Sequence, residues 1–288
     1  MPTPSADSLH RPPVVAGRFY DAVPGRLAQD VRARLALGQP LHEPSQFPHG
    51  PTLLAMVPHA GYVYSGDVAG KTLGAAALAE TLLLLGPNHT GQGAPLALWP
   101  GGSWRIPTGD VPVDEALARA LLDAVPRLTP DTAAHRGEHS LEVLLPFLLQ
   151  ANPACRIVPV AVAESSLGTL LAVAQAMAGV LRSWPAPVSI VVSSDMSHYL
   201  PQETAAAQDR KALERVLALD PEGLHATVRR ERISMCGVLP MTLGLAMARE
   251  LRAPDAAPPH LVEYTTSGQV SGDYDQVVGY AGVLVPGA

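Results

Sequence analysis

Cysteine, aromatic side chains and long apolar runs are all scarce in this sequence of 288 residues. Its two cysteines are too few for a disulfide framework and are typical of a protein in the reducing cytoplasm. Aromatic residues make up only 5% of the chain, which argues against a surface that stacks nucleic-acid bases. The apolar runs TLLLLG and SIVVSS are far too short to cross a bilayer, and the N-terminal MPTPSADSLHRPP lacks the apolar core of a signal peptide.

Charge of either sign is not concentrated in any segment. The formal net charge is −6, and the sequence holds no block of like charges that would attract nucleic acid or an anionic membrane. By contrast, 47% of the residues are hydrophobic, which over this length is enough to bury a large core. We therefore expect a globular cytoplasmic protein that binds neither nucleic acid nor membranes.

Short apolar runs alternate with amphipathic or Ala/Leu-rich stretches along most of the chain. The runs do not alternate with polar residues, which is typical of strands that are covered on both faces of a sheet. They predict strands at 53–57, 81–85, 157–162, 189–192, 261–265 and 277–285. The intervening stretches, with one before the first strand, predict helices at 25–37, 65–79, 113–124, 141–149, 167–183, 203–218 and 238–251.

This alternation predicts the α/β class, with three layers (α/β/α) around a largely parallel central sheet. Neither an internal repeat nor a break in composition divides the chain, so we expect residues 11–288 to form a single domain. We expect residues 1–10 to be disordered and 41–51 to form a loop.

Three of the predicted strands deliver a histidine just past their C-terminal ends. His59 follows the run LLAMV, His89 follows TLLLLG, and His198 follows SIVVSS with Asp195 between them. A single histidine in such a place is usually a structural residue that satisfies its own hydrogen bonds. Three of them at the C-terminal edge of a parallel sheet, where such folds bind ligands, indicate a site.

A metal ion is the natural occupant of such a site. Imidazole is a ligand for Fe, Zn and Cu, and two imidazoles with one anionic ligand leave coordination positions open for substrate. The residues offer two candidates for the third ligand. One is Asp195, and the other is Cys236, which precedes a predicted helix whose N-terminus favours the thiolate. The alternative for Cys236 is an inert buried thiol, which is also our interpretation of Cys155.

The segment HRGEHSLE at 135–142 carries two further candidates, Glu138 and His139. Gly137 disfavours a continuous helix here, and Ser140 is a typical helix cap. Glu138 and His139 are therefore expected either to line the site or to serve the start of the next helix. The polar loop YTTSGQVSGDYD at 264–275 could likewise line the pocket or only turn the chain.

Motifs of several other enzyme classes are missing from the sequence. It has no Gly-x-Ser-x-Gly elbow, no Walker A loop and no GxGxxG at a strand-to-helix turn. The histidines in polar or loop surroundings receive no role; they are His10, His42, His49, His225 and His260.

Eight motifs follow one another between residues 14 and 285: VVAGRFYDAVPGRLAQDV, PHAGYVYSG, LLGPNHTG, WRIPTGDVPVD, EHSLEVLLPF, VSSDMSHY, MCG and YTTSGQVSGDYDQVVGYAGVLV. In this order they resemble the Memo family (mediator of cell motility), whose prokaryotic members are called AmmeMemoRadiSam system protein B. Tyr64 and Asn88 stand in these motifs close to His59 and His89. Together with Glu138 and His139 they are predicted to line the pocket.

The resemblance implies a fold similar to that of LigB-type class III extradiol dioxygenases, which hold non-haem iron with two histidines and a glutamate. Carried over to this sequence, His59 and His89 occupy the histidine positions, and Cys236 takes the place of the carboxylate. His198 matches the acid/base histidine, with Asp195 beside it. A thiolate in place of a carboxylate favours copper or tightly held iron and makes dioxygenase activity itself doubtful.

Three functional hypotheses follow. The leading one is a redox protein that binds Fe(II) or Cu, or alternatively Zn, at a site of His59, His89 and Cys236. In this hypothesis His198 transfers protons, and Asp195 orients the His198 imidazole. The alternative is a non-catalytic binding module whose former dioxygenase cleft captures a peptide or protein partner. A third is zinc-dependent hydrolysis with Asp195 as a ligand. The resemblance also implies a small molecule or peptide as ligand and a functional link to radical-SAM and AMMECR-type proteins.

Overall fold

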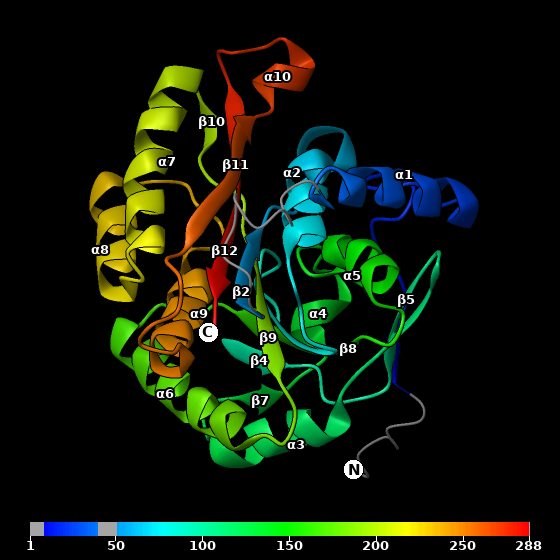
Figure 1. Ribbon diagram of the computed structural model, residues 1–288, viewed down its shortest axis with the longest axis vertical. Coiled ribbons are helices and arrows are strands. Elements are labelled where there is room, and N and C mark those ends of the chain that lie inside the picture. Colours follow the sequence, from blue (N-terminus) through cyan, green and yellow to red (C-terminus); the bar gives the residue numbers. More distant parts are fainter. Residues whose placement is uncertain (1–8, 40–50, 288) are drawn as a thin grey trace.

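The computed structural model describes residues 9–39 and 51–287 (Figure 1). Most of the predicted disordered N-terminus and of the predicted loop at 41–51 lies outside these residues. The N-terminal prediction extends too far, because His10 forms strand β1 (His10–Arg11) and pairs with Ser103.

Four parallel strands form the centre of a nine-stranded sheet. They are β2 (Thr52–Val57), β9 (Val188–Ser193), β3 (Thr81–Pro87) and β8 (Arg156–Val162), in this spatial order. The outer strands are β10 (His198–Leu200), β11 (His260–Thr266), β12 (Val277–Pro286), β4 (Leu96–Leu98) and β7 (Thr129–Pro130). Strand β12 pairs antiparallel with β2, and β4 pairs antiparallel with β8. The sheet is therefore parallel at its centre and mixed overall.

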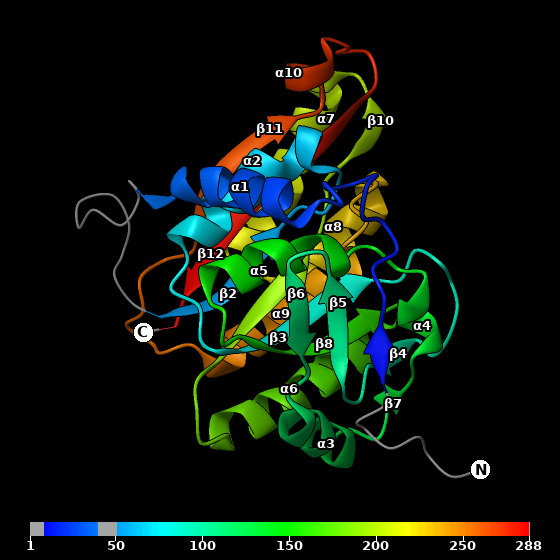
Figure 2. The ribbon, with the colours of Figure 1, turned by 90° about the vertical axis from the view of Figure 1, so that its right-hand side faces the viewer.

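Helices cover both faces of this sheet, which confirms the three-layer α/β prediction (Figure 1). One face carries α6 (Leu167–Ser183), α7 (Gln202–Leu217), α8 (Pro221–Glu231) and α9 (Val238–Leu251). The other carries α1 (Pro24–Ala36), α2 (Tyr62–Ala75) and α5 (Leu145–Ala151). A small sheet of β1, β5 (Ser103–Ile106) and β6 (Gly109–Pro112) lies beside α5, as Figure 2 shows for β5 and β6.

The core lies between the helices and the central strands. All seven residues of β3 are buried, as expected for a strand whose two faces are both covered. Helix α9 approaches the sheet closely at Gly244, where a Cβ would lie 2.8 Å from a Val192 methyl carbon and 3.1 Å from one of Leu54. This contact holds α9, and the residues just before it, against the central strands.

The predicted and observed elements agree best where the hydrophobic pattern is long. Helices α6 and α9 have the predicted bounds. The predicted helix at 141–149 is instead a 3-10 turn, Glu142–Leu144, that leads into α5. Three of the described helices were not predicted: α8, α4 (Ala133–Arg136) and α10 (Gly268–Ser271). The strands β1, β4, β5, β6, β7 and β10 were also not predicted, because they are too short to show a hydrophobic period. Helix α3 covers Glu115–Ala124. Within the described ranges, no helix is long and apolar enough to cross a membrane.

Gly282 of β12 provides a test of how tightly α2 packs on the sheet. A Cβ at this position would lie 1.8 Å from Oγ1 of Thr72, which is held in place because it donates a hydrogen bond of 2.7 Å to Val68 O. We expect Gly282→Ala to lower the free energy of unfolding by about 1–3 kcal/mol, measured by urea denaturation. Gly25→Ala is the control, since a Cβ there meets nothing within 4 Å, and it should be neutral or slightly stabilising. Equal stability of the two variants would contradict this packing.

Candidate metal centre

The ends of three central strands bring the candidate residues to one edge of the sheet. Strands β2, β9 and β3 are parallel neighbours, so their C-terminal ends lie side by side. His59 follows β2, His89 follows β3, and Asp195 follows β9. His59 and Asp195 are buried, whereas 34% of the His89 side chain is exposed. The site therefore opens to solvent beside His89.

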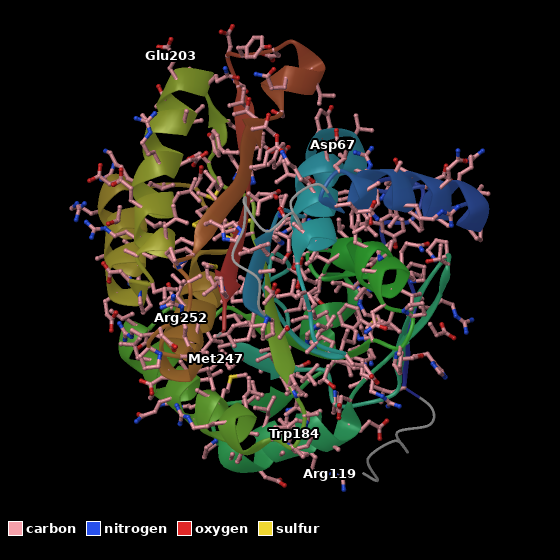
Figure 3. The ribbon with its side chains drawn as sticks, viewed as in Figure 1. Asp67, Arg119, Trp184, Glu203, Met247 and Arg252 are labelled. Atoms are coloured by element: carbon pink, nitrogen blue, oxygen red, sulfur yellow. The ribbon has the colours of Figure 1, made fainter. Side chains whose placement is uncertain are left out.

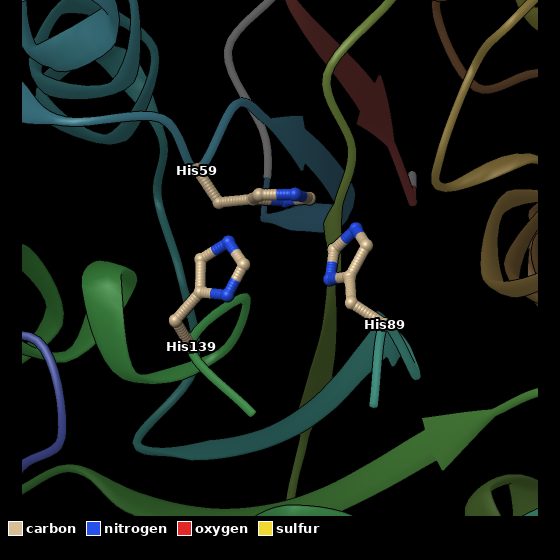
Figure 4. A group of neighbouring side chains, drawn as sticks. All are labelled: His59, His89 and His139. Atoms are coloured by element: carbon tan, nitrogen blue, oxygen red, sulfur yellow. The ribbon is translucent and has the colours of Figure 1, made fainter. Parts of the chain in front are cut away.

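His59, His89 and His139 form a group that could hold a metal ion (Figure 4). One ligand nitrogen from each lies within 4.8 Å of those of the other two. The ring centroids are 5.3 Å apart for His59 and His89, 5.6 Å for His59 and His139, and 5.0 Å for His89 and His139. His139 was predicted only to line the pocket, yet it stands among the candidate ligands.

A serine on β9 fixes the orientation of His59. Ser193 Oγ lies 2.7 Å from His59 Nδ1 and donates its own proton to Ser140 O at 2.6 Å. Because that proton is already used, Oγ must accept the hydrogen bond from Nδ1–H. This tautomer leaves the lone pair of Nε2 free for a metal.

Glu138 does the same for His89. Its Oε1 lies 2.9 Å from His89 Nδ1 and its Oε2 accepts the His89 backbone N–H at 2.5 Å, so Nε2 of His89 is left free. The same carboxylate accepts the N–H of Ser140 at 3.0 Å and lies 3.5 Å from His139 Nδ1. Burial raises the pKa of Glu138, but the hydrogen bond and charge of His89 outweigh it and lower the pKa to about 2. Glu138 is therefore a carboxylate at neutral pH.

The imidazoles of His59 and His139 are kept neutral, the form that binds metals. Burial, and then the charges of His89 and His139, hold the pKa of His59 well below its ordinary value. Burial also lowers the pKa of His139. His89 differs: burial lowers its pKa, but the hydrogen bond and charge of Glu138 raise it above 6.5. Metal binding at His89 therefore competes with a proton.

Cys236 lies two residues before the start of α9, with its Sγ 3.4 Å from Nε2 of His59. A tetrahedral zinc with an N bond of about 2.0–2.1 Å and an S bond of about 2.3 Å places these two atoms about 3.5 Å apart. The observed separation is compatible with two ligands of one metal ion and equally with a hydrogen bond from the thiol to Nε2. In the described part of the chain, the group whose ligand atoms lie within 4.8 Å of one another contains the three histidines and not Cys236. Burial, and then the charge of Asp195, raise the pKa of the Cys236 thiol well above its ordinary value. Without a cation the thiol stays protonated, because burial raises its pKa by more than the N-terminus of α9 lowers it.

Asp195 and His198 each bond to other partners, although Asp195 was expected to orient the imidazole of His198. Asp195 Oδ1 accepts the backbone N–H of His59 at 2.8 Å. Nδ1 of His198 lies 2.9 Å from Ser234 O, so Ser234 orients this ring, where Asp195 was the predicted partner. Among the described residues, the group of mutually close ligand nitrogens consists of His59, His89 and His139, and His198 is not a member of it. Nε2 of His198 is left free to exchange a proton.

The other predicted lining residues are Asn88, in the turn after β3, and Tyr64, in the first turn of α2. Asn88 closes the turn after β3: its Oδ1 accepts the N–H groups of Thr90 and Gly91, and its Nδ2 donates to Gln92 O. Asn88 thus shapes the loop that carries His89. Tyr64, in the first turn of α2, is 43% exposed, and its place in the pocket lining stays a prediction.

Sequence reasoning missed Ser193 and placed His139 among the lining residues only. His135 and His139 are four residues apart, but His135 does not join the group. It is fully buried, with Nε2 3.0 Å from Ala97 O and its ring in edge contact with both Trp99 and Trp104. A serine at the end of a buried strand carries no signal of its own.

A model of the Memo-like protein family matches residues 11–284. The chain belongs to the Memo family. A MEMO1 family protein from Methanopyrus kandleri is 39% identical over 287 residues, which cover 96% of this chain and 99% of that relative. Another from Archaeoglobus fulgidus is 37% identical over 278 residues, covering 95% and 98%.

One solved structure supports the Memo fold independently of sequence. An uncharacterized protein from Escherichia coli K12 superimposes with a TM-score of 0.55 at 12% identity, covering 81% of this chain and 98% of that one. At this identity the likeness concerns the fold alone.

Ser193 provides a test of the candidate metal centre. Ser193→Ala removes the acceptor that fixes the His59 tautomer, so the zinc affinity should fall about 10–100-fold, measured by competition with a chelator. Ser189→Ala is the matched control, because Ser189 is also a buried serine of β9, bonded through Oγ to Thr52 O at the opposite end of the strand. It should leave the affinity unchanged. An equal loss in both variants would mean that Ser193 acts only through stability.

Proposed function

We propose that this protein is a metal-dependent redox protein that binds Fe(II) or Cu through His59, His89 and Cys236. The observation that supports this most directly is the pair of imidazoles with Nδ1 engaged, by Ser193 and by Glu138, next to a thiol 3.4 Å from His59 Nε2. Nitrogen and thiolate donors suit Cu, Fe and Zn, and of these Cu and Fe carry electrons. His139 is the neighbouring imidazole that could replace the thiolate as third ligand.

The metal would supply one-electron chemistry, and the side chains around it would manage the protons. His198 has Nδ1 bonded to the Ser234 carbonyl, so its Nε2 can take a proton from a substrate or return one. Asp195 fixes the backbone of His59. The open side beside His89 would admit a small molecule or a peptide.

The second candidate is a binding module that captures a peptide or protein partner in the same cleft. An exposed aromatic residue next to the site favours it: Tyr199 follows His198, is 73% exposed and has a φ of 58°, a conformation that non-glycine residues adopt rarely. The cellular setting proposed here is the cytoplasm, with a functional link to radical-SAM and AMMECR-type proteins.

Metal loading of ligand variants tests the site. The wild type should bind about one Fe(II) or Cu ion per chain after anaerobic loading, measured by elemental analysis after desalting. His59→Ala and His89→Ala should lose this metal, and Cys236→Ser should bind copper at least tenfold more weakly. Cys155→Ser is the control, because Cys155 is a buried thiol at the N-terminal end of β8, whereas His59 and His89 follow the C-terminal ends of strands parallel to β8. If Cys236→Ser binds normally while His139→Ala does not, the thiolate assignment is wrong and three histidines hold the metal.

Oxygen consumption separates the redox protein from the binding module. With ascorbate as the reductant, which gives up two electrons and two protons to convert O₂ to H₂O₂, the copper- or iron-loaded protein should consume O₂. His198→Ala should slow this at least tenfold with nearly unchanged metal content, because an acid/base residue need not hold the metal. His10→Ala, which alters a histidine of β1, should have no effect. Metal-loaded wild type that consumes no O₂ would contradict redox function and favour the binding module.

A further inference from the structure

Arg11 is a fully buried charge whose guanidinium reaches the segment that carries Glu138 and His139. Its side chain has 0% of its surface exposed. Nε donates to His135 O at 2.8 Å, and one terminal nitrogen donates to Glu138 O. The other terminal nitrogen forms an ion pair of 2.7 Å with Glu142 Oε2. The guanidinium carbon lies 4.2 Å from the centroid of the Trp104 ring.

Glu142 extends this contact to the rest of the N-terminal segment. Its carboxylate accepts the backbone N–H groups of Val14 and Val15 at 2.9–3.0 Å and the hydroxyl of Tyr20 at 2.8 Å. The ring of Phe19, from the same segment, packs edge-on against His139 with centroids 4.9 Å apart. The N-terminal segment is thus fastened directly to the residues around His139.

We propose that Arg11 is a positioning residue for the metal centre. Its planar fork holds two carbonyl oxygens three residues apart, at 135 and 138, and so fixes the turn between them. This sets the backbone of His139 directly. It also sets the carboxylate of Glu138, which in turn fixes the ring and the backbone N–H of His89. Arg11 therefore acts on two of the three grouped histidines without touching either ring.

The inference rests on the proposed metal site, and a purely structural role for Arg11 would look different. If Arg11 had only a structural role, replacing it would change the stability of the fold but not the orientation or protonation of the imidazoles. A positioning residue changes the metal affinity and the state of His89 even in a folded variant. The two roles can therefore be separated in the same protein.

Arg11→Lys tests this, because it keeps the charge opposite Glu142 but removes the fork that binds two carbonyls at once. We expect the zinc dissociation constant of the full chain to rise at least tenfold, measured by chelator competition at a temperature where the variant is folded. In the metal-free protein, ¹⁵N NMR should show Nδ1 of His89 fully protonated in the wild type, because Nδ1 donates to Glu138, and partly unprotonated in Arg11→Lys.

Arg252→Lys is the matched control. Arg252 also donates to two backbone carbonyls, those of Ala256 and Ala257. It follows the C-terminal end of α9 (Figure 3), whereas Cys236 precedes the N-terminal end of this 14-residue helix, about 21 Å away. This variant should keep the wild-type zinc affinity and His89 signal.

Wild-type zinc affinity together with an unchanged His89 signal in folded Arg11→Lys would overturn the proposal. If Arg11→Lys does not fold, the double variant Arg11→Met with Glu142→Gln removes both charges of the buried pair and leaves neither unpaired. The same two measurements then decide, with the same outcomes. If the wild type binds none of zinc, Fe(II) and copper, the proposed metal function fails, and the His89 signal of the metal-free variants alone supports or overturns the role of Arg11.

Discussion

The carboxylate of Glu138, a residue with 2% of its surface exposed, lies against two of the four candidate ligands, 2.9 Å from Nδ1 of His89 and 3.5 Å from Nδ1 of His139. Its negative charge is stable there because it accepts two backbone N–H groups, from His89 and Ser140, and the ring proton of His89. Each bond that stabilises the carboxylate also immobilises a part of the metal centre. The position of Glu138 is in turn dictated by the backbone contact with Arg11, so a buried ion pair at the N-terminus and the geometry of two imidazoles form one network.

The parts of the fold that follow from local pattern could be predicted from the sequence. The central strands and helices α6 and α9 have long hydrophobic runs, and His59 and His89 stand where parallel strands end. His139 could not be ranked as a candidate ligand, because its position depends on contacts between 138–142 and residues 11–20, which are far away in the chain. Short strands such as β7, which is two residues long, form because they pair with a neighbouring strand, and they are too short to show a periodic hydrophobic pattern.

The protonation state of the Cys236 thiol could not be predicted from its position before a helix alone. A helix N-terminus does favour a thiolate, but the thiol is also surrounded by protein and lies near Asp195, and both raise its pKa. The thiol therefore has no reason to ionise until a cation arrives. A site of this kind keeps its sulfur unreactive in the metal-free protein and exposes its nucleophilic form only as a ligand.

The candidate ligands come from four separate places: the ends of β2 and β3, the turn after α4, and a position two residues before α9. None of these four ligand candidates is close to another along the chain. An unfolded chain therefore offers a metal ion no pair of closely spaced ligands drawn from these four residues. The candidate ligands come together only after β2, β9 and β3 have assembled and α9 has docked against them, so any metal affinity of this group belongs to the folded protein and not to the nascent chain.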